Sequence, residues 1–154
     1  MNQFDERFES AFGKVSFTVN RFILEHMCRI TRELDMDLES VHIWGILANL
    51  NVLHLMAPGK NFDFRDTTEA NHAYEFRPVR LSDMAQITGI PRETIRRKLN
   101  QLEESGKVER TADGLWTIKA TGVDEHVKAF TKETVIRYLR VAKEIENLLM
   151  DAKV

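Results

Sequence analysis

The stretch ITGIPRETIRRKLNQLEESGKV, residues 87–108, decides the fold of this 154-residue chain. It places four cations, Arg92, Arg96, Arg97 and Lys98, within seven residues, although the net charge of the whole chain is −2. A Gly-Ile-Pro sequence stands directly before them. A local excess of positive charge next to a turn signal, in an acidic chain, indicates a localised surface that binds a polyanion.

The pattern of this stretch predicts a turn followed by an amphipathic helix. Gly89 can adopt the left-handed conformation that a tight turn between two helices needs. Pro91 suits the start of a helix, where a missing N–H costs nothing. Ile95, Leu99 and Leu102 recur at offsets of four and seven, and should form the buried face. The side chains left outside are Arg92, Glu93, Thr94, Arg96, Arg97 and Asn100.

The flanking residues predict a short helix before this one and a β-hairpin after it. Ser82 is the expected cap of the first helix, and Gly106 should end the second. A turn at residues 112–114 then joins two short strands. The strands are expected to carry Val108, Leu115, Trp116 and Ile118.

Residues 81–119 therefore resemble a winged helix-turn-helix, and GIPRETIRRKLNQLEESGKVER is similar to the recognition region of MarR-type transcription regulators. The order of elements agrees with that family, because helices precede the motif and one long helix follows it. The resemblance implies a mainly α fold with a small β-hairpin, flanked by N- and C-terminal dimerisation helices. It also implies a sequence-specific DNA-binding regulator whose recognition helix, residues 91–105, enters the major groove.

Each polar residue of the motif has an expected contact with double-stranded DNA. Arginines reach phosphates or guanine edges, and a threonine suits a phosphate or a thymine methyl group. Glu93 either accepts from cytosine N4 or pairs with Arg97 four residues on. Lys107 and Arg110 would steer the hairpin onto the neighbouring backbone. The predicted DNA-binding residues are Arg92, Glu93, Thr94, Arg96, Arg97, Asn100, Lys107 and Arg110.

The N-terminal segment, residues 1–56, is predicted to be helical and to contribute to the core and to a dimer. A first short helix should end at Gly13, and Ser16 should cap a second helix, which the sequence DMD at 35–37 breaks. A third helix, 38–56, is apolar on nearly every side, so it is buried or shared between subunits. Residues 57–80 show no period and are predicted to be a long connection.

The C-terminal segment, residues 120–154, is predicted to be one long helix capped by Thr121, with Asp124 three residues on. Its apolar stripe contains Val127, Phe130, Thr134, Tyr138, Val141, Ile145 and Leu148, and a second row contains Val135, Leu139, Ala142 and Leu149. Such a broad stripe either packs on its own domain or forms a homodimer interface. We favour the dimer because the N-terminal helices show the same surplus of apolar surface.

Composition narrows the class of protein. No apolar run reaches the length of a membrane span, and the N-terminus lacks the order of a secretory signal, so we expect no membrane partner. The single cysteine, Cys28, fits a reducing cytoplasm, and we expect it to be buried rather than redox-active. No metal-ligand spacing, phosphate-binding loop, dinucleotide motif or paired catalytic carboxylates occur, so we expect no metal, no cofactor and no enzymatic activity.

Two questions stay open at this stage. A winged helix can also serve as a protein-interaction module without direct DNA readout. A small-molecule effector is a further candidate partner, and Trp44, Asn49, Asn51 and His54 could line its pocket. We favour a place for these four side chains in the core or in an interface.

Overall fold

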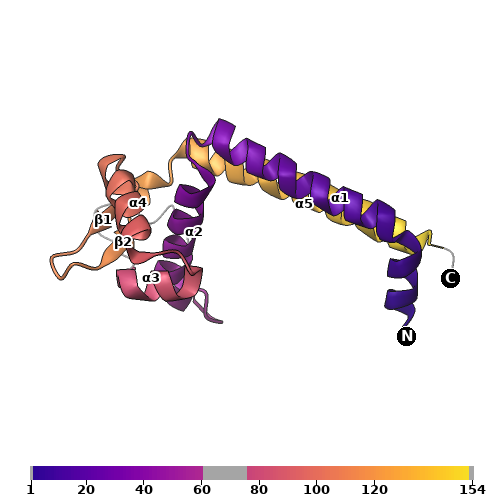
Figure 1. The fold of residues 1–154 in the computed structure, drawn as a ribbon, viewed down its shortest axis with the longest axis horizontal. Coiled ribbons are helices and arrows are strands. Elements are labelled where there is room, and N and C mark those ends of the chain that lie inside the picture. The colour runs from indigo at the N-terminus through magenta and orange to yellow at the C-terminus, as the bar shows by residue number, and fades with distance from the viewer. Residues whose placement is uncertain (1, 61–75, 153–154) are drawn as a thin grey trace. The chain divides into compact units, whose positions relative to one another are not determined.

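The computed structural model describes residues 2–60 and 76–152 (Figure 1). Among them it is mainly helical with one two-stranded hairpin, which confirms the predicted fold class at this level. The elements are α1 (Gln3–Glu33), α2 (Leu38–Val52), η1 (Leu53–Leu55), α3 (Leu81–Thr88), α4 (Arg92–Glu104), β1 (Val108–Arg110), β2 (Trp116–Ile118), η3 (Ala120–Gly122) and α5 (Glu125–Met150). Most of the predicted connection, residues 61–75, lies outside the described residues.

The chain forms two compact units. One unit consists of residues 1–35 together with 125–154, and the other of residues 36–124. The predicted N-terminal segment, residues 1–56, thus contributes α1 to one unit and α2 to the other. Helix α2 belongs with the winged helix-turn-helix, whereas α1 and α5 make a unit of their own.

Helices α1 and α5 run antiparallel and side by side (Figure 1). Arg29 of α1 holds the pair together, because its buried guanidinium forms an ion pair with Glu33 at 2.9 Å and donates to the Thr134 hydroxyl at 3.2 Å. The same guanidinium lies over the Phe130 ring, 4.6 Å from its centroid. This buried charge therefore has both a carboxylate and an aromatic partner, as the cost of desolvating it requires.

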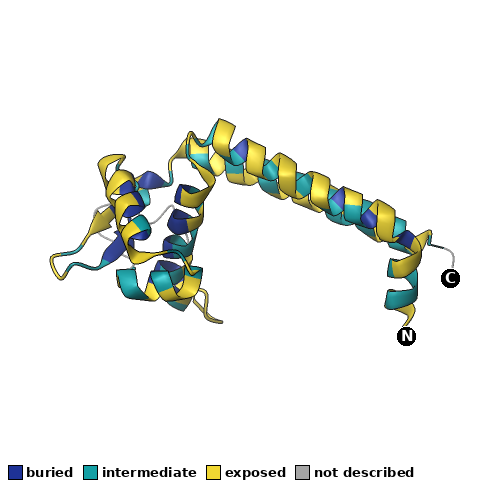
Figure 2. Ribbon diagram, in the orientation of Figure 1, coloured by how far each residue is buried: buried dark blue, intermediate teal, exposed yellow. Residues whose placement is uncertain are grey.

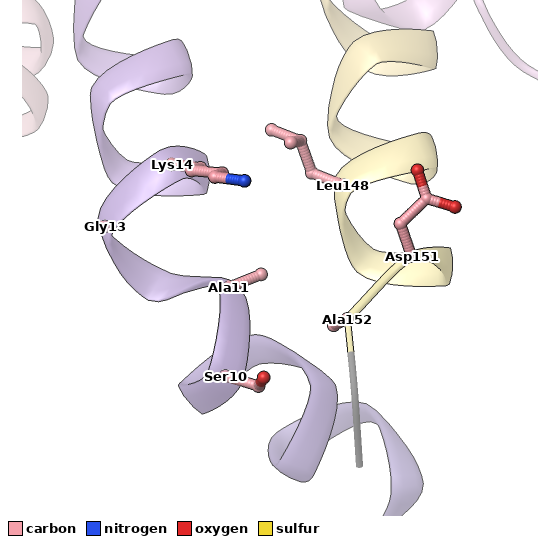
Figure 3. Close-up of a pocket in the computed structure, with 7 residues that line it drawn as sticks. All are labelled: Ser10, Ala11, Gly13, Lys14, Leu148, Asp151 and Ala152. Atoms are coloured by element: carbon pink, nitrogen blue, oxygen red, sulfur yellow. The ribbon is translucent and has the colours of Figure 1, made fainter.

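The predicted break near Gly13 was wrong, because α1 is continuous from Gln3 to Glu33. Asn2 caps the helix through a capping box with Asp5. Gly13 and Ser16 lie inside the helix, and the first turns of α1 bend away from the rest of it (Figures 1 and 3). A mid-helix glycine costs about 1 kcal/mol relative to alanine, which packing can offset.

Three further local predictions were wrong. Thr121 lies in η3, and α5 begins only at Glu125, directly after Asp124. The N-cap position of α3 is Arg80, whose side chain makes no capping hydrogen bond, and the predicted cap, Ser82, is the second residue of that helix. Cys28 is exposed, because it lies on the side of α1 that α5 does not cover. The two cap errors are shifts of a few residues in elements that do form where expected.

The second unit contains a closed apolar core. Helix α2 packs against α3, α4 and β2, and Figure 2 shows the buried residues gathered where these elements meet. β1 and β2 pair antiparallel with Val108 opposite Ile118. The fully buried apolar side chains of this unit include Ile43, Leu47, Met84, Ile95, Leu99, Val108, Trp116 and Ile118. Helix α2 is thus a central helix of the winged helix-turn-helix unit, as its all-round hydrophobicity predicted.

One buried amide joins three segments of this unit. The Asn51 side chain is 0 % exposed; its Nδ2 donates to the Arg77 carbonyl at 2.7 Å and its Oδ1 accepts from the Ile118 amide at 2.8 Å. Val79 next to this site exchanges two backbone hydrogen bonds of 2.9 Å with Trp116. Residues just before α3 therefore extend the hairpin by an isolated bridge, and Asn51 fixes that bridge to α2.

We expect Asn51→Ala to lower the free energy of unfolding by about 1–3 kcal/mol, because it leaves the buried Ile118 N–H without an acceptor. Chemical denaturation followed by circular dichroism measures the change. The matched control is Asn49→Ala on the same helix, since Asn49 is exposed and its side chain donates to the Gly45 carbonyl of its own helix. The control should change stability by about 0.5 kcal/mol or less. Equal effects of the two substitutions would contradict the role of Asn51.

Candidate nucleic-acid interface

The turn between α3 and α4 has the geometry that the sequence predicted. Gly89 adopts φ 69°, in the left-handed region, and its amide donates to the Ala85 carbonyl at 3.0 Å. The Thr88 hydroxyl donates to the Met84 carbonyl and accepts from the Ile90 amide, which closes the corner. The chain then enters α4 directly after Pro91.

Helix α4 buries one stripe and exposes the opposite one. Ile95, Leu99 and Leu102 are buried against the rest of the unit, as predicted. Figure 2 shows buried and exposed residues interspersed along α4. Of the predicted contact residues on this helix, Thr94 is half-buried and the exposed ones are Arg92, Glu93, Arg96, Arg97 and Asn100. The arginine-bearing side of α4 therefore faces solvent within this unit.

Glu93 pairs with Arg96, so the predicted pair with Arg97 was wrong. The Glu93 carboxylate accepts from Arg96 Nη2 at 2.7 Å and from Arg96 Nε at 3.1 Å. These hydrogen bonds lower the pKa of Glu93, and the charges of Arg96 and Arg97 lower it further. A spacing of three residues served the bidentate geometry better than the predicted spacing of four. Arg97 forms no ion pair with any residue that the structure describes.

The fourth cation of the opening stretch, Lys98, does not belong to the exposed face. Its side chain is only 11 % exposed, and its Nζ lies 2.8 Å from Asp37 Oδ2 and 3.8 Å from Glu39 Oε2. Lys98 is not among the predicted DNA contacts, and its partner was not predicted from the sequence. Lys98 follows Ile95 by three residues, so the spacing of the buried stripe itself places it on the inner side.

Asp37, the N-cap residue of α2, forms the ion pair with Lys98. Its carboxylate caps that helix by accepting from the Ser40 amide at 2.9 Å, and it accepts from the Ser40 hydroxyl at 2.7 Å. Desolvation acts to raise the pKa of Asp37, but the hydrogen bonds from Lys98 and Ser40 outweigh it and hold the pKa well below its usual value. The ion pair thus links the middle of α4 to the first turn of α2.

The two remaining residues predicted to contact DNA, Lys107 and Arg110, each lie near the ring of a tryptophan. Lys107 is half-buried, with its Nζ 5.2 Å from the centroid of the Trp44 ring. Arg110 is exposed at the end of β1, and its guanidinium lies 5.7 Å from the centroid of the Trp116 ring. Both cations keep a polar end outside while an aromatic face supports them. The predicted turn at 112–114 is present, and Gly114 adopts φ 79°.

Three of the four residues considered for an effector pocket have described surroundings in α2. The side-chain amide of Asn51 forms hydrogen bonds with backbone groups of its own unit, and Trp44 is buried in the core. Asn49 is exposed and donates to the Gly45 carbonyl. Asn51 therefore has a structural role in this unit.

A cavity of about 460 Å³ lies in the other unit, between the beginning of α1 and the end of α5 (Figure 3). Small side chains line much of it, and Lys14 extends across it toward Leu148. Its lining offers one cation and one anion, Lys14 and Asp151, without a converging set of polar groups. We therefore assign no ligand to it.

Among residues 2–60 and 76–152 there is no group of three or more histidine, cysteine, aspartate or glutamate side chains that could hold a metal ion. None of the described helices combines the length and the hydrophobicity that crossing a bilayer requires. The exposed arginines of α4, a helix that follows a tight turn, are the main chemical feature of the unit formed by residues 36–124.

Comparison with protein families gives one match, to the DeoR-like helix-turn-helix domain, over residues 76–121. The matched range begins before α3, and so includes the bridge between Val79 and Trp116. This match indicates a winged helix-turn-helix of a DNA-binding transcription regulator; it does not support the MarR-type resemblance in particular. No curated protein and no solved structure matches the chain.

We expect Asp37→Asn to lower the free energy of unfolding by about 1 kcal/mol at pH 7, because it removes the charge opposite Lys98 but keeps an acceptor that can cap α2. The folded-state pKa of Asp37 is lowered, so the ion pair stabilises the fold above the unfolded pKa of about 3.9, and this contribution falls as the pH drops below that value. The difference between wild type and variant should therefore shrink below about pH 4.

Urea denaturation at several pH values measures this difference. Asp35→Asn is the matched control, because it removes a carboxylate two residues earlier that makes no ion pair with Lys98. A difference for Asp37→Asn that stays constant down to pH 2 would contradict the assignment.

Proposed function

We propose that this protein is a sequence-specific DNA-binding transcription regulator that acts as a homodimer and inserts α4 into the major groove. The observation that carries the proposal is the outer side of α4, where Arg92, Arg96 and Arg97 stand opposite the buried stripe of the same helix. An exposed second helix after a tight turn is the geometry that helix-turn-helix proteins present to base edges. The DeoR-like match over the same residues supports this function.

The charges along α4 suggest which end of the helix meets DNA. The three arginines lie in its first half, whereas Glu103 and Glu104 close its last turn. DNA phosphates would be repelled by the acidic end and attracted by the basic one. The first half of α4 therefore enters the groove, where Arg97 can contact a guanine edge or a phosphate.

The other predicted contact residues have supporting roles in this proposal. Asn100 continues the exposed stripe and reaches a base or a phosphate at its margin. Lys107 and Arg110, each supported by a tryptophan ring, contact the phosphate backbone beside the groove. Glu93 holds Arg96 in an extended geometry through two hydrogen bonds, and can release it to DNA.

A homodimer would place two copies of α4 in successive major grooves, about 34–36 Å apart, on a pseudo-palindromic site. Large apolar side chains on both helices of the α1–α5 unit are exposed in the single chain, which supports self-association. Helix α5 contains no buried residue. A small-molecule effector, if the protein has one, would act by binding one spacing of the two recognition helices better than another.

The second candidate function is a winged-helix protein-interaction module. It predicts no binding to any duplex and no salt dependence, whereas a DNA-binding regulator must lose affinity as salt rises. The clustering of arginines on the exposed side of α4 favours the DNA-binding function.

We expect Arg97→Ala to weaken binding to a duplex selected from a random pool by about 1–3 kcal/mol, which is roughly 5- to 150-fold in Kd. Fluorescence anisotropy at one fixed salt concentration measures the loss, and circular dichroism checks the fold. The control is Arg140→Ala, which removes an exposed cation from α5 and should change Kd less than about twofold. Unchanged affinity of a folded Arg97→Ala protein would contradict the role of this residue.

A further inference from the structure

The two long sides of the α1–α5 hairpin differ in chemistry. Successive residues of a helix turn by about 100°, so residues three, four and seven apart share a side. In each helix, residues can be displaced from the contact line either in the direction in which the chain winds or against it. When the two helices are antiparallel, residues displaced in the winding direction lie on the same side of the pair in both helices. Residues of α1 and α5 can therefore be assigned to one of two sides of the hairpin.

One side is apolar along most of its length. Its centre is formed by Ile23 and Met27 of α1 together with Val135 and Tyr138 of α5, and all four are exposed. These residues lie in the same stretch of the hairpin, because the ring of Tyr138 is 6.1 Å from that of Phe22 and Arg29 contacts Thr134. The apolar side further includes Phe12, Val19, Ile30, Leu34, Leu139, Ala142, Ile145 and Leu149.

The opposite side is charged and makes its own ion pairs. Arg21 of α1 bridges to Glu144 of α5 at 2.9 Å, and Glu133 bridges to Arg137 at 2.7 Å. A shallow cavity of about 220 Å³ on this side is lined mainly by the charged residues Arg21, Glu25, Arg137, Arg140 and Glu144. Solvated ion pairs of this kind need no further partner.

We infer that the apolar side of the hairpin is the surface on which a second copy of this chain docks, so that two hairpins form a four-helix bundle with the charged sides outward. This inference rests on the homodimer proposed above and specifies its interface. The shared feature of the apolar side is that α1 and α5 both contribute to it, which suits an isologous contact between identical surfaces.

The size of the surface fits a stable dimer. α1 has 31 residues and α5 has 26, so their shared length is about 40 Å, and two helices side by side are about 20 Å wide. The face is then roughly 800 Å², which is about the area that each partner buries in a standard protein interface. A second copy would also cover α5, because the described residues of this unit form only two helices and no third layer packs on them.

Two neighbouring residues of α5 provide a matched test. Val135 lies on the apolar side and is 51 % exposed, whereas Ile136 points to the other side of α5 and is 43 % exposed. Both are β-branched, so replacing each by glutamate changes helix propensity and surface charge alike. We expect Val135→Glu to raise the dimer dissociation constant roughly 30-fold or more, because each dimer must then bury two carboxylates, and Ile136→Glu to change it less than about threefold.

Sedimentation equilibrium over a range of micromolar concentrations measures both constants for the full-length chain. Circular dichroism verifies that each variant keeps its helical content. If Val135→Glu loses helix, the uncharged pair Val135→Thr and Ile136→Thr replaces it, with a smaller but still one-sided loss of dimer expected. Ile23→Glu tests the same side from α1 and should behave like Val135→Glu.

Equal weakening by the two glutamate variants, or a stronger effect of Ile136→Glu, would overturn the inference. A wild-type chain that sediments as a monomer would overturn both the inference and the homodimer, but not DNA contact by α4, which the Arg97→Ala titration measures independently. A dimer that dissociates only with Val135→Glu and Ile23→Glu is the supporting result.

Discussion

The rotational setting of α4 is the constraint on which the proposed function depends. Three apolar side chains fix which side of the helix faces the core, and the buried Lys98 shares that side by bonding to Asp37 at the start of α2. A charge that has left water needs its partner, so this contact discourages any rotation that would separate the two. Because the inner side is defined by both packing and charge, Arg92 and Arg97 are held on the outside.

The two units manage their apolar surface in different ways. In residues 36–124 the helices and the hairpin enclose a core, and Asn51 satisfies the backbone groups where three segments meet. In the α1–α5 unit the Arg29–Thr134 hydrogen bond and the Arg21–Glu144 ion pair join the two helices, while one side of the hairpin stays apolar and exposed. The unit with the closed core exposes mainly polar side chains that can contact DNA. The unit with an exposed apolar side can associate with a second copy.

Local chemistry predicted much of this structure from the sequence. The turn at Gly89, the stripe through Ile95 and Leu99, and the hairpin follow from spacing and turn residues alone. The break expected at Gly13 failed because tertiary packing and the cap at Asn2 outweigh one glycine. The contact of Lys98 with Asp37 was not predicted, because a lysine is normally expected on the exposed side of a helix. Its spacing from Ile95 nevertheless places it on the inner side. The bridge from Val79 to Trp116 joins residues far apart in sequence, so no local signal could reveal it.

The most direct test of the central claim is the salt dependence of DNA binding by a chain in which Arg92, Arg96 and Arg97 are all replaced by alanine. Each lost phosphate contact should reduce the slope of log Kd against log salt by about 0.9. We predict a folded protein with much weaker binding and a slope that is smaller by roughly one to three, depending on how many of the three arginines contact phosphate rather than bases. An unchanged affinity and slope in that folded variant would show that the outer side of α4 does not meet DNA.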